Sequence, residues 1–306
     1  MSNIPTHLIR LILAPVLLFT LGLTACTGTL ANAPGNGSPA PTIQVVAAEN
    51  FYGDIVRQLG AGHVSVISIL SDPNVDPHEY ESNVQDSLAV SQAQLVIENG
   101  ADYDAWMDKL LAASPNPNRI VLTASNLAVN KLPDNPHFWY SLDNIKAISS
   151  AITATLEKFD PVDKANFEAS LSTFQQSLTP IQQKIDELKS KYAGNPVGLT
   201  ETIYLYQSGP IGLNVLTPFD FEKAIAEGND PPADTVVTAS DQISHHAIKV
   251  LIYNVQTVTP LTTNLQDAAR KNNIPIVPVS ETMPLGKNYQ SWMLDQLNAL
   301  QQALGG

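Results

Sequence analysis

Short apolar segments alternate with amphipathic segments along most of this chain, and one long stretch interrupts the alternation. Between the apolar segments, hydrophobic side chains recur at spacings of three and four, which predicts helices. Alternation of this kind is typical of parallel sheets with helices on their faces. We therefore predict an α/β protein, with strands near residues 43–47, 63–70, 94–97, 119–123, 197–199, 250–253 and 274–279.

The interruption, Asp143–Tyr192, has no strand signal and keeps the helical spacing throughout. Asp160-Pro161 should separate two helices, and Pro180 should kink or divide the second, because proline cannot continue a helix interior. After it we expect helices near 239–248, 259–271 and 289–304, and a loop over 209–237 that contains one helix near 219–227. The predicted architecture is two α/β lobes, 42–142 and 195–306, joined by long linking helices at 143–194.

The charge balance excludes one large class of partners. The 306 residues include 29 acidic and 16 basic side chains, which gives a formal net charge of -13. Such a field repels the phosphates of nucleic acids and is compatible with attracting cations. Hydrophobic residues make up 44% of the chain and charged residues 15%, so the sequence is not that of a disordered protein or a coiled coil.

Residues 1–25 have the pattern of a secretory signal peptide. Arg10 precedes the apolar run Leu11–Leu23, which is shorter than the roughly 20 residues that span a bilayer. The run ends in Leu-Thr-Ala-Cys, which resembles a bacterial lipobox, and Cys26 is the only cysteine of the chain. We expect lipidation of Cys26, a flexible tether over 26–41, and an extracytoplasmic protein anchored to a bacterial membrane. An ordinary signal peptide with a chance cysteine is the alternative.

Two histidines stand out because each follows a proline in a loop after an expected strand. His78 lies in the segment D-P-H-E-Y-E, and His137 lies in N-P-H-F-W. Loops after the carboxyl ends of parallel strands line the ligand crevice of open α/β sheets. The two imidazoles can therefore meet, although surface-loop histidines are the plainer interpretation of each motif alone. The chain has no Gly-rich phosphate loop, no G-x-S-x-G elbow and no H-E-x-x-H pair.

An ordered set of motifs carries a family resemblance. It consists of the lipobox, the opening V-V-A-A-E-N-F-Y-G-D at 45–54, the D-P-H-E-Y-E segment, E-N-G-A at 98–101 and the N-P-H-F-W segment. Together they resemble the zinc and manganese solute-binding proteins of bacterial ABC transporters, over essentially the whole mature chain. The resemblance implies one metal site in the cleft between two lobes and no catalysis.

The resemblance also implies the ligands of that site. His78 and His137 match the two ligands of the N-terminal lobe, Glu201 matches the third ligand, and Glu281 is the carboxylate nearest to the position of the fourth. Two neutral imidazoles and two carboxylates would neutralise a divalent cation. Solvent-exposed acids at strand ends are the alternative for both glutamates.

The cargo implied is Zn²⁺ or Mn²⁺. The chain lacks the histidine-rich loop of many zinc-type members, and a glutamate as third ligand resembles the manganese-type branch. Such a donor set nevertheless binds zinc more tightly than manganese. The implied protein is a monomeric receptor that delivers the metal to an ABC permease. A secreted zinc-dependent hydrolase, or an adhesin-like lipoprotein with a structural metal site, are the alternatives.

Overall fold

The computed structural model describes residues 42–73, 75, 77 and 80–305, and the statements below refer to these residues. The predicted signal peptide, the tether with Cys26, and His78 lie outside them. Within the described ranges, no helix combines the length and the hydrophobicity needed to cross a membrane.

The first sheet has four parallel strands in the order β2-β1-β3-β4. The central strand β1 (Ile43–Glu49) is buried at all but one position, as expected for a strand covered on both faces. It pairs with β2 (Val64–Leu70) on one side and β3 (Leu95–Glu98) on the other, and β4 (Ile120–Thr123) forms an edge. The associated helices are α1 (Asn50–Gly60), the 3₁₀ turn η1 (Ala61–His63), α2 (Val84–Gln92), α3 (Ala105–Ala113) and α4 (Ala124–Leu127).

The second sheet repeats this topology, with parallel strands in the order β6-β5-β7-β8. Its strands are β5 (Pro196–Leu199), β6 (Asn214–Val215), β7 (Val250–Asn254) and β8 (Ile276–Val279). In each sheet the strand order reverses beside the first strand, which is where open α/β sheets form a crevice. The helices of this part are η5 (Thr202–Tyr204), α8 (Leu205–Ile211), α9 (Phe219–Ala226), α10 (Ala233–Ser244), α11 (Pro260–Lys271) and α12 (Tyr289–Ala303).

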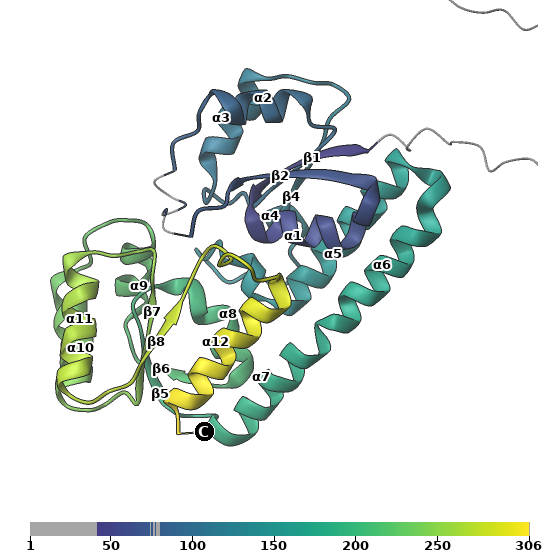
Figure 1. The fold of residues 1–306 in the computed structure, drawn as a ribbon. Coiled ribbons are helices and arrows are strands. Elements are labelled where there is room, and N and C mark those ends of the chain that lie inside the picture. The colour runs from purple at the N-terminus through teal and green to yellow at the C-terminus, as the bar shows by residue number, and fades with distance from the viewer. Residues whose placement is uncertain (1–41, 74, 76, 78–79, 306) are drawn as a thin grey trace, which may run out of the picture. The chain divides into compact units, whose positions relative to one another are not determined.

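Helices alone connect the two sheets, as the sequence predicts. They are α5 (Leu142–Phe159), the short turn η4 (Pro161–Asp163), α6 (Lys164–Ser177) and α7 (Thr179–Tyr192). Pro180 lies in the first turn of α7, so it divides the expected second helix at Leu178. Figure 1 shows α6 and α7 following one another past the first sheet and then the second.

The loop predicted over 209–237 is wrong in part. Helix α8 continues through Pro210 to Ile211, and the short strand β6 follows it. Helix α10 begins at Ala233, directly after Pro232, and ends at Ser244, so the helix expected over 239–248 is displaced toward the N-terminus. Two residues after its end, His246 has a left-handed backbone, which cannot continue a helix.

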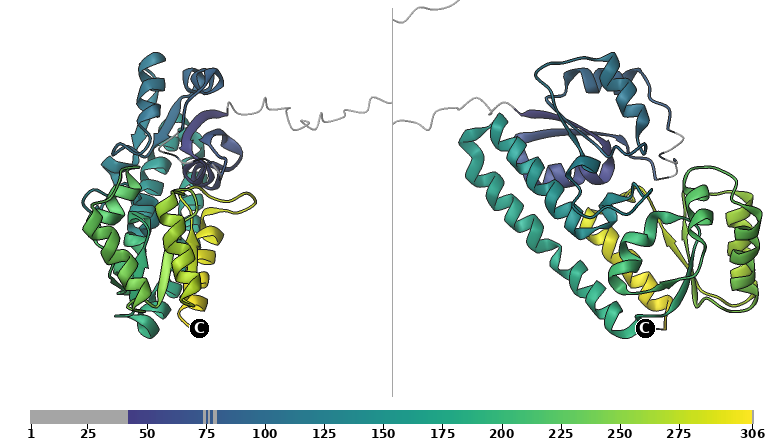
Figure 2. Two further views of the ribbon diagram at one scale, coloured as in Figure 1. Left: turned by 90° about the vertical axis from the view of Figure 1, so that its left-hand side faces the viewer. Right: turned by 180° about the vertical axis from the view of Figure 1, so that it is seen from behind.

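One apolar core joins both sheets to the connecting helices. A single cluster of buried side chains contains residues of β1, β5, α5, α7 and α12. At its centre Phe51 stacks on Trp139 with ring centroids 4.5 Å apart, and Trp292 of α12 lies 6.0 Å from Phe51. Figure 2 shows α12 beside α7 from behind. The C-terminal helix therefore packs into the same core as the first helix.

Candidate metal centre

Three of the four predicted ligands come together in the structure. His137, Glu201 and Glu281 have exposed fractions of 0%, 1% and 1%, and one ligand atom from each lies within 4.8 Å of the others. The fourth, His78, lies outside the described residues. The two glutamates follow β5 and β8, and His137 precedes the 3₁₀ turn η3 (Phe138–Tyr140). The cluster thus forms where the carboxyl ends of the second sheet meet the loop after α4.

Asn135 fixes the orientation of the His137 imidazole. Its amide nitrogen donates to the carbonyl of Thr202 at 2.8 Å, so its Oδ1 faces His137 as an acceptor. That oxygen accepts from the backbone N–H of His137 at 3.1 Å and lies 2.8 Å from Nδ1 of the ring. Nδ1 therefore carries the proton, and the lone pair of the neutral ring is on Nε2. Nε2 lies 3.9 Å from Oε2 of Glu201, on the side where the carboxylates converge.

Glu201 is a buried carboxyl group at the start of η5. Its Oε2 accepts from the backbone N–H of Ile203 at 3.1 Å, while Oε1 accepts no hydrogen bond from the described part of the chain. Burial raises the pKa of Glu201 well above its usual value, and the charge of Glu281 raises it further. The N–H of Ile203 acts in the opposite direction. A cation between the two carboxylates would favour the ionised form.

Glu281 is held by donors on both carboxylate oxygens. Oε1 accepts from Asn254 at 2.6 Å and from Thr257 at 3.4 Å. Oε2 accepts from the Tyr103 hydroxyl at 2.8 Å. Asn254 ends β7 and Thr257 follows it, whereas Tyr103 precedes α3 near the first sheet. The fourth predicted ligand is therefore oriented by both halves of the protein.

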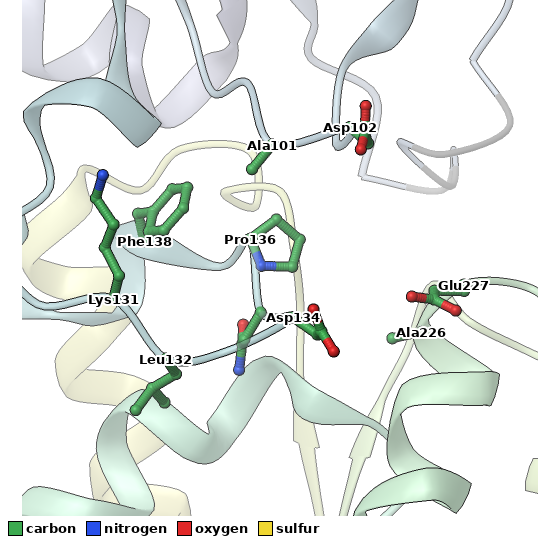
Figure 3. A pocket seen from close by; sticks show the side chains of 10 residues that line it. Ala101, Asp102, Lys131, Leu132, Asp134, Pro136, Phe138, Ala226 and Glu227 are labelled. Atoms are coloured by element: carbon green, nitrogen blue, oxygen red, sulfur yellow. The ribbon is translucent and has the colours of Figure 1, made fainter.

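A cavity of about 470 Å³ opens beside the His137 loop. Asn135, Pro136 and Phe138, which flank His137 in sequence, form part of its wall. Figure 3 shows the carboxylates of Asp102, Asp134 and Glu227 around this cavity, with Lys131 at one side. Three acidic side chains against one basic side chain favour cations over anions at this opening.

The first sheet carries a second group of buried carboxyl groups at its strand ends. Glu49 ends β1 and Glu98 ends β3, and Asp104 accepts from the backbone N–H groups of Asn99 and Gly100 at 2.6 and 2.7 Å. Burial, and then the charge of Asp104, raises the pKa of Glu49 well above its usual value. Burial raises the pKa of Glu98 to about 7. These groups add negative potential around the centre only where they ionise.

Asn135, Tyr103 and Asn254 were not singled out from the sequence, although they orient the predicted ligands. A signal exists for two of them. Asn135 lies two residues before His137, and an asparagine side chain can accept a hydrogen bond from the backbone N–H two residues further along the chain. Asn254 ends β7, at the same sheet edge as Glu201. Nothing in the sequence links Tyr103 to Glu281, because that contact depends on how the two halves pack.

The family model of ZnuA, the periplasmic zinc-uptake complex component A, matches residues 45–303. The chain belongs to this family. Its members are solute-binding receptors and not enzymes, so the fold class and the receptor class expected from the motifs are confirmed.

Curated relatives point the same way. The metal ABC transporter substrate-binding lipoprotein ScbA of Streptococcus cristatus is 24% identical over 312 residues, which covers 94% of this chain and 96% of the relative. The manganese ABC transporter substrate-binding lipoprotein ScaA of Streptococcus gordonii is 28% identical over 197 residues. That match spans 59% of this chain and 60% of the relative's length.

The fold is also found among solved structures. The periplasmic zinc-binding protein TroA from Treponema pallidum superposes with a TM-score of 0.73 at 17% identity, over 87% of this chain and 100% of that one. FpvC from Pseudomonas aeruginosa, solved in complex with Mn²⁺, gives a TM-score of 0.71 at 18% identity, over 86% of this chain and 98% of that one. At sequence identities this low, the superpositions show that this chain has the same fold as these proteins.

Proposed function

We propose that this chain captures a divalent transition metal, Zn²⁺ or Mn²⁺, outside the cytoplasm and delivers it to the permease of an ABC importer. The ligands are His78, His137, Glu201 and Glu281. In this proposal the lobes comprise residues 42–142 and 195–306, and the helices of 143–194 link them. The ion is cargo, so the site must bind it selectively and also release it.

The observation that carries the proposal is the burial of two carboxyl groups beside one imidazole, with a ligand atom of each within 4.8 Å of the others. Glu201 and Glu281 are both buried, and the charge of Glu281 raises the pKa of Glu201, so ionising both carboxyl groups side by side is unfavourable without compensation. A divalent cation supplies that compensation, and the Nε2 lone pair of His137 faces the same point. Nitrogen and carboxylate oxygen are donors that first-row divalent metals accept.

Attachment to the membrane belongs to the same proposal. A lipid on Cys26 and a tether over 26–41 would keep a monomeric receptor near its permease, and several relatives are named as lipoproteins. The family assignment argues against the hydrolase alternative, since four protein ligands leave little room for a catalytic water. A purely structural metal site would require the metal for folding, whereas this core is closed by apolar side chains.

Intrinsic affinity alone does not identify the physiological cargo ion. Two imidazoles and two carboxylates bind Zn²⁺ more tightly than Mn²⁺, because intrinsic affinity rises along the divalent series. Relatives named for manganese and for iron both occur. Elemental analysis of protein purified from its own host identifies the physiological ion.

Metal titration of purified variants tests the proposal. One ion should bind tightly per chain. His78→Ala and His137→Ala should each remove most of that affinity for Zn²⁺ and Mn²⁺, because each deletes a nitrogen ligand. His245→Ala, which alters an exposed histidine at the end of α10, is the matched control and should bind as the unmodified chain does. Tight binding that survives in both ligand variants would disprove the site. Chelation should empty the site and leave the circular dichroism spectrum folded.

A further inference from the structure

A second group of metal-ligating side chains lies at the turn between α5 and α6. His63 ends η1, Asp160 follows α5, and Asp163 ends η4. Nδ1 of His63 lies 3.1 Å from Oδ2 of Asp163 and 3.6 Å from Oδ2 of Asp160. The three ligand atoms lie within 4.8 Å of one another. None of these residues belongs to the centre around His137.

The two distances from the His63 nitrogen are those of ligands that share one ion. Zinc binds histidine nitrogen and carboxylate oxygen at about 2.0–2.2 Å. Two such ligands are then roughly 3.0 Å apart in an octahedral site and roughly 3.4 Å apart in a tetrahedral one. The two distances from the His63 nitrogen fall close to these values, so only a small movement would be needed to admit an ion.

The charges at this turn favour a cation. Two carboxylate oxygens point at one imidazole nitrogen, and a single N–H can donate fully to only one of them. The nearest lysine in sequence, Lys164, is directed elsewhere and pairs with Glu157 and Glu168. It therefore does not stand in for a cation between Asp160 and Asp163.

The groups are also held in place and accessible. The Asn166 amide donates to Oδ1 of Asp163 at 2.8 Å, which leaves Oδ2 directed toward the imidazole. The rings of Phe167 and His63 pack in a T-shaped arrangement, with centroids 5.5 Å apart. The side chains of His63, Asp160 and Asp163 are 27%, 20% and 24% exposed, so water can reach an ion there and complete its coordination.

We propose that His63, Asp160 and Asp163 form a second site for a divalent transition metal such as Zn²⁺ or Ni²⁺. It has three protein ligands and open positions, so it binds more weakly and exchanges faster than a buried site with four ligands. An ion there would join the start of β2 to the turn between α5 and α6. This inference goes beyond the transport function and does not depend on it.

Equilibrium dialysis of the whole purified chain against Zn²⁺, and separately Ni²⁺, tests the second site. The unmodified chain should bind two ions, His137→Ala should keep only the weaker one, and His63→Ala should keep only the tighter one. The double variant His63→Ala/His137→Ala should bind neither. The double variant His245→Ala/His246→Ala, which removes the adjacent exposed pair, should still bind two and serves as the control.

Asp163→Asn keeps the size and the Asn166 contact and should weaken binding of the second ion about tenfold or more. It checks the site independently, because His63→Ala also removes the packing against Phe167. A second ion that persists in both His63→Ala and Asp163→Asn would overturn the inference, and so would a single ion in the unmodified chain. Loss of only the tight ion in His137→Ala tests the cargo site separately. Failure of one proposal is thus distinguishable from failure of the other.

Discussion

Neighbouring side chains hold Glu281 in place, so a substitution that keeps its size can test the effect of its charge alone. Asn254, Thr257 and Tyr103 all donate to it, and they fix both carboxylate oxygens. A carboxylate placed in this way can bind an ion without reorganising. Its charge is then the property that decides how tightly the ion is held.

Glu281→Gln should lower metal affinity about tenfold or more, equivalent to roughly 1.4 kcal/mol, because it removes one negative charge and keeps the size of the side chain. Calorimetric titration measures the loss, and circular dichroism of the metal-free variant checks the fold. Asp186→Asn on the exposed face of α7 is the control and should leave affinity unchanged. Full affinity in Glu281→Gln would move the fourth ligand to water or another acid.

Glu98 gives the metal-free protein a stability that depends on pH. Its pKa is raised to about 7 by burial, whereas an unfolded chain has the ordinary value near 4.3. Between these two values the folded state binds more protons, so the free energy of unfolding falls as pH rises through this window and levels off above it. The Thr123 hydroxyl bonds Oε1, an atom that glutamine retains.

Glu98→Gln should therefore be more stable than the unmodified chain above about pH 7, by on the order of 2 kcal/mol, and the advantage should vanish near pH 4.5. Urea unfolding at several pH values, with chelator present, measures it. Glu81→Gln on an exposed loop is the matched control. A constant difference across the range would show that Glu98 is not the titrating group.

Among the elements, the start of α1 supports the loop after β8. Asn50 is only 7% exposed, and its side chain donates to the carbonyl of Met283 at 2.7 Å and accepts from the N–H of Met283 at 2.9 Å. Met283 lies two residues after Glu281. The first helix of the chain thus fixes the segment that carries the fourth predicted ligand.

Asn50→Ala should cost about 2 kcal/mol of unfolding free energy, because it leaves a buried N–H and a buried carbonyl without partners. It should also weaken metal binding several-fold through the freed loop, although Asn50 does not lie in the ligand cluster. Chemical unfolding and metal titration of the same preparation measure both effects. Asn229→Ala, at an exposed position, should change stability by less than about 0.5 kcal/mol. A loss of stability without any loss of metal affinity would show that the loop held by Asn50 does not position a metal ligand.

Secondary structure could be predicted from the sequence where hydrophobic periodicity is strong, but not where tertiary packing determines whether a segment is helical. The strands β1 and β7 and the division at Pro180 follow from local patterns. Helix α8 contains a glycine and a proline, so its local pattern argues against a helix, and tertiary contacts override it. The repeated topology of the two sheets leaves no visible repeat in the sequence, because many apolar residues serve equally well in a buried strand.

The site shows the same division between local and distant information. His137 and Glu201 lie beside recognisable strand ends and motifs, so they could be predicted with the help of the family resemblance. The contact of Tyr103 with Glu281 spans 178 residues of sequence. No local pattern encodes such a pairing, and only the folded core brings the two together.

For the whole molecule, bound metal should raise the free energy of unfolding and the Tm. An ion that binds only the folded state at 100 times its dissociation constant adds about 2.7 kcal/mol, which corresponds to a rise in Tm of roughly 5 to 10 °C for a domain of this size. Thermal unfolding with Zn²⁺ and with chelator measures it. The rise should shrink as pH falls from about 7.5 to 5.5, because an imidazole must be neutral to bind metal and the unperturbed pKa of histidine is about 6.5. An unchanged rise over that range would argue against histidine ligation.

The order of the proposed ligands along the chain sets when an ion could be captured. His137 lies near the middle of the sequence, and Glu281 is close to its end. At about 5 to 20 residues per second, the ribosome needs roughly 7 to 29 seconds to add the 281 - 137 = 144 residues between them. During that interval a growing chain offers an ion only part of the donor set. Tight loading of the proposed site therefore waits until Glu281 has been made and β8 has paired in the second sheet.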